Sequence, residues 1–424
     1  MPAPMKTGRR SSRVASAALL SLSLTAAPVL AAAPALAADK PSPSTSPTAT
    51  PPARMSTVGG ERLGEPGTQV ELGSGAPVLP KDITARSWII ADAESGEVLA
   101  AHNAHWRLAP ASTLKMLLAD TLLPKFNKDE EHKVASSDLA GIGIGSSLVG
   151  VKEDETYTVH DLWLGVFLRS GNDAVHVLSA MNGGVKQTVE DMNEHAEELQ
   201  ALDTNVVSPD GYDAKGQVSS AYDLTLIARS GLQKKDFREY ASTVRAQFPG
   251  ETVKKKGKKT RGSFEIQNTN RLLTGDADVD PYEGIAGVKN GNTTNAGSTF
   301  TGVAERDGRV LLVTVMNPEK NEHNEVYKET ARLFDWGFKA ADKVEPVGEL
   351  VPPKGAATGA SAQPGAGASP EVSWSTGSKP VAAAGTKGSG GIGVALAVTA
   401  GVLALLAGAV FVVNRRWPLR RSRS

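Results

Sequence analysis

A serine and a lysine stand three residues apart in the segment Ser112-Thr113-Leu114-Lys115, at the predicted start of a helix. This spacing places the hydroxyl and the amine on the same face of the helix. A partly desolvated lysine can take the proton of a neighbouring alcohol, and the helix N-terminus favours the anion that forms. The segment alone therefore allows a serine nucleophile with a lysine base, or a helix-capping serine beside a solvated lysine.

Two further segments carry polar groups that such a nucleophile could use. Ser170 and Asn172, separated by one glycine, follow a predicted helix. A loop there could present a hydroxyl and an amide, or the glycine could simply end the helix. Lys289-Asn290-Gly291 precedes a predicted hairpin. It either brings a positive charge to a sheet edge that aligns an extended peptide, or forms an ordinary turn.

The elements that must position these segments follow a mixed α and β pattern. Apolar runs separated by turn residues indicate hairpins, while a Pro-Ala-Ser start and a Thr-x-x-Asp capping box indicate helices. The expected elements are a hairpin of residues 86–92 and 97–102, a helix from Pro110, a helix behind Thr158 that runs to Arg169, a hairpin of residues 298–305 and 309–316 around Asp307-Gly308, and a helix over residues 325–340.

In this order, the three segments resemble the S-x-x-K, S-x-N and K-T-G set of penicillin-interacting serine enzymes. The flanks RLAPASTLK, GSSLVGVKEDETYTVHDLWLGVFLRSGNDAV, VSPDGYDAKGQVSSAYDL, NTNRLL and GIAGVKNGNTTNAG are similar to low-molecular-mass penicillin-binding proteins, the serine-type D-Ala-D-Ala carboxypeptidases. The resemblance covers about residues 84–340. It implies the α/β (α+β) penicillin-binding protein/β-lactamase-like fold, an antiparallel sheet flanked by helices with a helical subdomain that holds the S-x-N loop.

The resemblance also implies a role for each matching residue. Ser112 is expected to be the acylated nucleophile and Lys115 its general base. Ser170 and Asn172 relay protons and position the substrate amide, and Lys289 holds the substrate carboxylate. The N–H of Ser112 and one from the strand after Lys289 form the oxyanion hole. The implied reaction removes the terminal D-alanine of a peptidoglycan stem peptide, in cell-wall synthesis or remodelling, without a cofactor or metal. β-Lactams are the expected covalent inhibitors.

The sequence departs from the family pattern where the substrate carboxylate binds. The third motif normally has threonine where this chain has Asn290, whose NH₂ group can still donate a hydrogen bond. The family also often has an arginine at the start of its last helix, where this chain has Val326. Asn292 and Thr293 lie just downstream and could compensate. The expected substrate-binding residues are Lys289, Asn290, Gly291 and Thr293.

Two other functions remain open on the sequence. A β-lactamase-like hydrolase of the same fold needs a second base to direct water, and no E-x-x-L-N-like segment lies between Ser170 and Lys289. A weakly active penicillin-binding or wall-scaffolding protein is favoured by the missing threonine and arginine. Release of D-alanine and modification by a penicillin distinguish the three functions.

The composition argues against several other classes of protein. The chain has 424 residues, no cysteine, 46 basic and 46 acidic residues. Removing the four cations of residues 1–37 and the five of residues 391–424 leaves 37 cations against 46 acids, a net charge of −9. An acidic body is a poor nucleic-acid binder, and a chain without cysteine has neither a thiol nucleophile nor Cys-ligated zinc.

The two ends predict a single-pass membrane protein with its catalytic domain outside the cell. A cationic start, an apolar run and the exit Ala35-Leu36-Ala37 indicate a secretory signal. Residues 392–413 carry no charge and are followed by arginines, which is typical of a transmembrane helix with a cytoplasmic tail. The predicted order is a signal peptide (1–37), a Pro/Ser/Thr-rich spacer (38–80), the peptidase domain (81–345), a Pro/Gly/Ala-rich stalk (346–391), the transmembrane helix (392–413) and a basic tail (414–424).

Two remaining features have no assigned role in this chemistry. His102 and His105 form a weak candidate metal pair, although ordinary surface or core positions are strongly favoured for both. No H-E-x-x-H or G-x-S-x-G motif is present, so a zinc peptidase or a Ser-His-Asp hydrolase is not supported. The run Lys254–Arg261 is densely cationic, and either forms a solvated loop or contacts anionic wall polymers.

Overall fold

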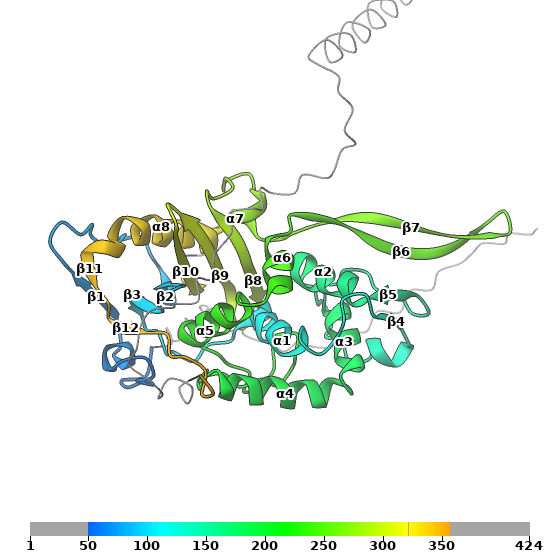
Figure 1. Cartoon of the computed structure of the whole chain (residues 1–424), viewed down its shortest axis with the longest axis horizontal. Helices are drawn as coiled ribbons and strands as arrows, with labels where there is room; N and C mark the ends of the chain where they lie inside the picture. The colour runs from blue at the N-terminus through cyan, green and yellow to red at the C-terminus, as the bar shows by residue number, and fades with distance from the viewer. Residues whose placement is uncertain (1–49, 321, 357–424) are drawn as a thin grey trace, which may run out of the picture. The chain divides into compact units, whose positions relative to one another are not determined.

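The computed structural model describes residues 50–320 and 322–356, the coloured part of the chain in Figure 1. The predicted signal peptide, transmembrane helix and basic tail, and the predicted stalk beyond residue 356, lie outside the described residues. Among the helices of the described residues, none is both long enough and apolar enough to cross a membrane.

An antiparallel sheet forms the centre of the domain, and eight of its strands lie in the described residues. Its strand order is β11-β1-β3-β2-β10-β9-β8, and β12 pairs with β3 beside that path. The strands are β1 (Thr68–Leu72), β2 (Ala85–Asp92), β3 (Glu97–His102), β8 (Ile285–Thr293), β9 (Gly297–Arg306), β10 (Arg309–Pro318), β11 (Val344–Glu345) and β12 (Gly348–Glu349). Both predicted hairpins are confirmed, as β2–β3 and β9–β10. The β9–β10 turn has φ values of 53° at Asp307 and 80° at Gly308, the positive values that a type I′ turn requires.

Helices cover both faces of this sheet (Figure 1). Alternate residues of the central strands point to opposite faces. Ile90, Leu311 and Val313 pack with helix α8 (Glu325–Ala340) in one apolar cluster. Ile89 and Leu312 pack in a second cluster with α5 (Ala221–Gly231) and α1 (Lys115–Leu122). Because both faces are apolar and buried, the sheet is a rigid support for groups carried at its edge.

A helical subdomain packs beside the sheet and confirms the predicted architecture. It contains α2 (Val159–Arg169), α3 (Asn172–Met181), α4 (Val185–Glu198) and α6 (Lys235–Ser242). Thr158 and Asp161 form the predicted capping box, with Asp161 N–H donating to Thr158 Oγ1 at 3.0 Å. Phe167 of α2 packs edge-on against Phe237 of α6, with ring centroids 5.2 Å apart. The apolar contacts of α2 and α6 therefore fix the end of α2, where the S-x-N segment begins.

The remaining elements are short or lie outside the central sheet. Two-stranded sheets are formed by β4 (Glu131–Lys133) with β5 (Thr156–Thr158), and by β6 (Arg245–Lys255) with β7 (Lys258–Gln267). Single turns of helix occur at η1 (Glu61–Gly64), η2 (Ala111–Leu114), η3 (Ser136–Leu139), α7 (Arg271–Thr274) and η4 (Ala341–Lys343).

The prediction of a flexible spacer over residues 38–80 was wrong from residue 51 onward. Strand β1 pairs with β3 and β11, and Leu63 is fully buried. Likewise β12, predicted to belong to the stalk, pairs with β3. A short strand near the edge of a sheet is held mainly by backbone hydrogen bonds and can keep exposed side chains. Because residues 38–80 are rich in Pro, Ser, Thr and Gly, their composition gave no indication that β1 belongs to the sheet.

Candidate active site

Ser112 lies in η2, which leads directly into α1 as the sequence predicted. The hydroxyls of Thr113 and Thr299 both donate to the carbonyl of Pro110, at 2.6 and 2.9 Å. These bonds tie the start of the helix to strand β9. Ser112 itself is half-buried, so its hydroxyl lies where a substrate can reach it.

Lys115 lies one helical turn after Ser112 and touches it directly. Its Nζ donates to Ser112 Oγ at 2.8 Å and also to the backbone carbonyl of Asp210. Burial lowers the pKa of Lys115 to about 8, against the attraction of the Asp210 and Asp173 carboxylates. An amine with this pKa is partly neutral near physiological pH and can accept the serine proton.

Ser170 and Asn172 occupy the short connection between α2 and α3. Ser170 ends α2 in a left-handed conformation with φ 56°, and Asn172 begins α3. Asn172 Nδ2 donates to Ser146 Oγ at 3.0 Å. Ser170 Oγ and Asn172 Oδ1 are buried, and neither has a hydrogen-bond partner among the described residues. A buried polar atom without a partner is costly, so both atoms are suited to bind a substrate.

Lys289 lies in edge strand β8 and is the second basic residue of the site. It is 1% exposed, and its Nζ donates to the carbonyl of Asn290 at 2.8 Å. Burial, together with the charge of Lys115, lowers the pKa of Lys289 well below its ordinary value. Asn290 Oδ1 accepts a hydrogen bond from Thr269 Oγ1 at 3.0 Å. That bond leaves the NH₂ group of Asn290 as its donor toward a ligand.

Gly291 brings the backbone of β8 against the nucleophile. A Cβ added at this glycine would lie 2.7 Å from the backbone nitrogen of Ser112 and 2.6 Å from Thr299 Oγ1. This close approach places the strand beside the N–H that the family resemblance assigns to the oxyanion hole. Thr293 lies differently from the expectation, because its hydroxyl donates to Asp213 Oδ1 at 2.7 Å. Its hydroxyl also accepts from the N–H of Ala296, so Thr293 stabilises the β8–β9 turn.

The comparisons with known proteins agree with this geometry. A family model described as D-alanyl-D-alanine carboxypeptidase, peptidase family S11, matches residues 74–320. The chain belongs to the D-alanyl-D-alanine carboxypeptidase family. It is similar to the D-alanyl-D-alanine carboxypeptidase DacB2 of Mycobacterium tuberculosis, with 35% identity over 268 residues, 62% of this chain and 86% of that protein. It is 31% identical to DacD of Escherichia coli over 61% of this chain, and the match spans 64% of DacD.

Solved structures show the same family likeness. The crystal structure of a D-alanyl-D-alanine carboxypeptidase from M. tuberculosis H37Rv matches with a TM-score of 0.58 and 33% identity, over 66% of this chain and 99% of that one. The Streptomyces K15 DD-transpeptidase matches with a TM-score of 0.56 and 24% identity, over 62% of this chain and 99% of its own. The second likeness concerns the fold alone.

Two acids support the carboxypeptidase site, and neither is a residue for which the sequence predicts a role. Asp173 accepts hydrogen bonds from the N–H groups of Val149, Gly150 and Val151 at 2.9, 2.7 and 2.9 Å. It therefore anchors the loop that carries Ser146, the partner of Asn172. The segments SGND and SPDG, both part of the quoted resemblance, were the available signals for these acids.

Asp210 is the second supporting acid, and its backbone carbonyl receives Lys115. Burial raises the pKa of its carboxyl group, but the hydrogen bond from His176 and the charge of Lys115 outweigh burial and hold that pKa well below its ordinary value. The carboxylate also accepts the N–H of Tyr212 at 2.9 Å. A permanent negative charge is therefore held next to the lysine base.

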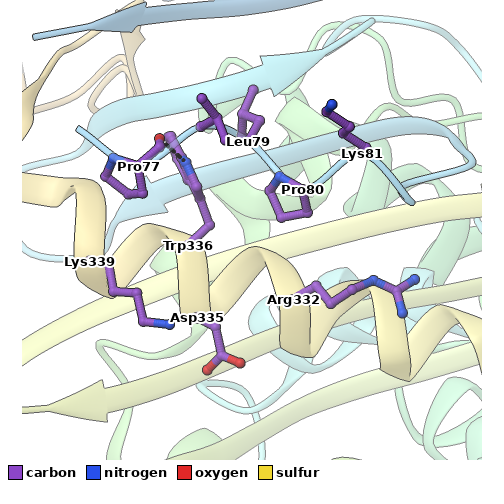
Figure 2. A pocket seen from close by; sticks show the side chains of 9 residues that line it. Pro77, Leu79, Pro80, Lys81, Arg332, Asp335, Trp336 and Lys339 are labelled. Atoms are coloured by element: carbon purple, nitrogen blue, oxygen red, sulfur yellow. Dashed lines mark hydrogen bonds between the residues drawn. The ribbon is translucent and has the colours of Figure 1, made fainter. Parts of the chain in front are cut away.

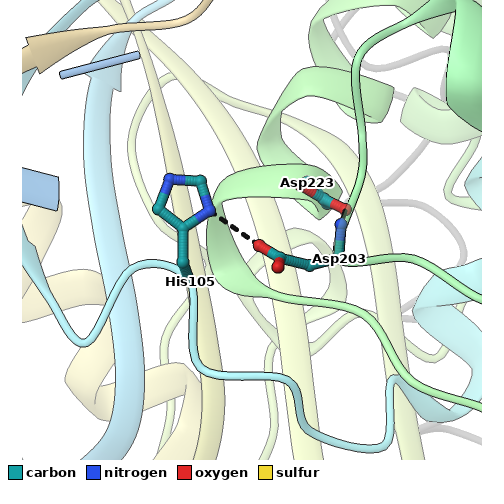
Figure 3. A group of neighbouring side chains, drawn as sticks. All are labelled: His105, Asp203 and Asp223. Carbon is teal, nitrogen blue, oxygen red and sulfur yellow. Dashed lines mark hydrogen bonds and ion pairs between the residues drawn. The ribbon is translucent and has the colours of Figure 1, made fainter. Parts of the chain in front are cut away.

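The predicted histidine pair does not assemble in the carboxypeptidase domain. His102 Nδ1 lies 2.7 Å from Thr68 Oγ1, whereas His105 is grouped with Asp203 and Asp223, whose ligating atoms lie within 4.8 Å of one another (Figure 3). His105 Nδ1 bonds to Asp203 at 2.7 Å, and its Nε2 bonds to the carbonyl of Val58 at 3.0 Å. Both ring nitrogens are thus engaged by groups of the domain itself, and we interpret the group as a clamp on the N-terminal segment.

A shallow recess beside α8 lies apart from these catalytic groups. Figure 2 shows its lining, in which Trp336 donates from Nε1 to the carbonyl of Pro77 at 2.9 Å. None of the predicted site residues lines this recess. The residues expected to carry the chemistry of the carboxypeptidase family lie instead around Ser112.

The rate of acylation of Ser112 is expected to rise with pH. We expect the neutral form of Lys115 to act as the base, and a pKa of about 8 makes about a tenth of it neutral at pH 7 and about nine-tenths at pH 9. We expect the rate at a saturating concentration of a fluorescent penicillin to rise roughly tenfold over this interval and then level off. At a saturating concentration every enzyme molecule holds penicillin, so an effect of Lys289 on the affinity for penicillin does not change this rate.

Lys115→Arg is the matched control for this pH profile. Arginine keeps the positive charge and the donors but cannot lose its proton in this range. The variant is expected to remain unlabelled at every pH. A wild-type rate that is flat or falls between pH 7 and pH 9 would show that Lys115 is not the base.

Proposed function

We propose that this chain is a D-alanyl-D-alanine carboxypeptidase that removes the terminal D-alanine from peptidoglycan stem peptides. The observation that carries the proposal is the 2.8 Å contact between Lys115 Nζ and Ser112 Oγ, made by a buried lysine whose pKa burial lowers to about 8. An alcohol becomes a strong nucleophile only beside such a base. Membership of the D-alanyl-D-alanine carboxypeptidase family supports the same reaction.

The reaction proceeds in two halves through an acyl-enzyme. Neutral Lys115 takes the proton of Ser112 while Oγ attacks the carbonyl carbon of the penultimate D-alanine. The C–N bond of the tetrahedral intermediate then breaks, and the nitrogen of the leaving D-alanine receives a proton. A water molecule next attacks the ester, its proton passes to a base in the site, and Ser112 regains its hydrogen. One peptide bond and one water are consumed.

Substrate recognition depends on the polar groups around Ser112. Lys289 supplies an amine close to the site whose charged form a bound carboxylate would favour, and the NH₂ group of Asn290 supplies a neutral donor for the terminal carboxylate. A neutral donor binds a carboxylate more weakly than an arginine does. The position where many family members have arginine is Val326, which is 4% exposed and packs in the apolar cluster under α8. We infer that Lys289 carries most of the attraction for the carboxylate.

The decisive test is release of D-alanine from a peptide that ends in D-Ala-D-Ala. The matched control peptide ends in D-Ala-L-Ala and has the same charge and size. We expect release of the terminal alanine from the first peptide and little from the second, with the free alanine from both peptides measured by mass spectrometry. Equal release from both peptides, or release from neither, would contradict the proposal.

We also infer where the enzyme acts and what inhibits it. The apolar segments at both ends of the sequence support secretion and anchoring by a C-terminal helix, with the catalytic domain outside the cytoplasm. Penicillins resemble an acyl-D-Ala-D-Ala end in their reactive amide and carboxylate, which supports their role as covalent inhibitors. Protease added to intact cells should cleave the domain from its anchor. A fully protected domain would contradict this location.

A further inference from the structure

The cationic run Lys254–Arg261 forms the end of the β6–β7 hairpin. The strands pair continuously from Thr252↔Arg261 to Lys255↔Lys258, and a two-residue turn joins them (Figure 1). The middle of the hairpin is anchored to the domain, because Thr252 Oγ1 donates to Glu155 at 2.9 Å and Arg261 donates to the carbonyl of Thr156. We use the name hairpin tip for the residues beyond this anchor, 253–260.

Four lysines of the hairpin tip are exposed and carry unneutralised charge: Lys254, Lys256, Lys258 and Lys259. None of them takes part in the ion pairs formed by residues 50–320 and 322–356. Two nearby acids are already engaged, since Glu155 binds Thr252 and Arg261, and Glu265 binds Arg245 at 3.1 Å. A third acid, Glu251, is exposed in β6 before the anchor and forms no ion pair with the four lysines among the described residues. The hairpin tip is therefore a concentrated positive charge on a domain whose charge is otherwise negative.

The arrangement of these lysines opposes folding of the hairpin. Lys254 stands directly opposite Lys259 in the strand register, and like charges in this position are destabilising. Lys256 takes φ 50° in the turn, where glycine, asparagine or aspartate is favoured. Neutral residues would fold better at these positions, so the charge itself is the property that needs an explanation.

We propose that the hairpin tip binds a linear polymer with repeating phosphate groups, such as a chain of phosphodiester-linked polyols. Lysine is a compact point charge that suits phosphate oxygens, whereas the acidic remainder of the body repels a polyanion. Adjacent residues Lys258 and Lys259 point to opposite faces of the strand, so the charge surrounds the tip. A flexible chain can contact both faces, but a flat membrane meets only one.

A membrane surface is less well matched to the hairpin tip for a second reason. Residues 254–259 contain only lysine and glycine, and the exposed apolar side chain beside them is Val253, at 53%. Peripheral membrane segments usually combine cations with aromatic or leucine side chains that insert among the lipids. Binding of the polymer would hold the domain along the wall and is separate from the peptidase reaction.

The test compares a hairpin variant with a matched surface variant of the full chain in neutral detergent micelles. The hairpin variant carries glutamine at the four exposed lysines of the tip. The control carries glutamine at four exposed lysines elsewhere, Lys128, Lys186, Lys235 and Lys339. The probe is fluorescent poly(glycerol phosphate), titrated with protein at several salt concentrations and followed by anisotropy.

The expected result is an increase in Kd of at least about tenfold for the hairpin variant, with a shallower dependence of log K on log salt, and little change for the control. The Tm of the hairpin variant should equal or exceed that of the wild type, because a repulsive pair is removed. Release of D-alanine from a small peptide should be unchanged. Equal weakening by both variants would overturn the proposal. So would loss of polymer binding when phosphatidylglycerol is added to the micelles, because lipid headgroups would then be the preferred partner.

Discussion

Ser112→Ala is expected to abolish covalent labelling by penicillin and to lower D-alanine release by at least about 10³-fold. The substitution removes Ser112 Oγ, the expected nucleophile, which lies 2.8 Å from Lys115 Nζ. The hydrogen bond from Lys115 to the carbonyl of Asp210 remains. Because Ser112 is half-buried at a helix start that Pro110 holds, loss of one oxygen should not disturb folding. The effect should therefore fall on the chemical step and not on stability.

Intact-mass spectrometry after incubation with penicillin is the measurement for this variant. The wild type should gain the mass of one drug molecule, mapped to the peptide that contains Ser112. Ser137→Ala, an exposed serine, is the control and should label like the wild type. An adduct that persists in Ser112→Ala would disprove the assignment of the nucleophile. Unmodified wild type beside hydrolysed drug would indicate a β-lactamase-like hydrolase, and unchanged drug and protein a scaffold.

Gly291→Ala is expected to slow acylation by roughly 10²-fold or more. The new Cβ would lie 2.7 Å from the backbone nitrogen of Ser112 and 2.9 Å from the Cβ of Ala111, so the helix start or the strand must move. That nitrogen carries the N–H expected to stabilise the oxyanion, and removal of one such donor typically costs 10²–10³ in rate. The loss should appear in the rate at saturating penicillin.

Gly262→Ala is the matched control for this substitution. It also lies in a β-strand, but an added Cβ there meets no heavy atom within 4 Å. It should acylate at the wild-type rate, and both variants should keep the far-ultraviolet circular dichroism of the wild type. Wild-type acylation by Gly291→Ala would show that β8 does not shape the oxyanion site.

Sequence patterns predicted those parts of the site that depend only on residues close together in the chain. Ser112 and Lys115 are one helical turn apart, so their contact follows from the helix alone. The capping box at Thr158 is likewise a matter of three-residue spacing. The same reasoning could not find Asp210, because its carbonyl reaches Lys115 across 95 residues of sequence.

Other residues were given the wrong role because their partners in the structure lie far away in the sequence. Thr293 follows the Lys289 segment closely, yet its hydroxyl bonds to Asp213, 80 residues away in the chain. Residues 68–72 were predicted to be linker from the composition of residues 38–80, but their backbone pairs with β3 and β11 while most of their side chains stay exposed. In both cases the deciding partner was distant in sequence, and composition carried no information about it.

The pairing of β12 with β3 has a mechanical consequence. The N–H of Glu349 donates to the carbonyl of Gly59 at 2.8 Å, and that of Leu350 donates to the carbonyl of Gly96 at 2.7 Å. A pull on the C-terminal segment first loads the contacts of Pro352 and Lys354 with residues 197–200 at the end of α4, and the bonds of Glu349 and Leu350 come next. Strands β2, β10 and β9 separate β3 from β8, where Lys289 lies. Once the contacts with α4 have broken, tension along the chain is borne at this side of the sheet, and the catalytic edge lies at the other side.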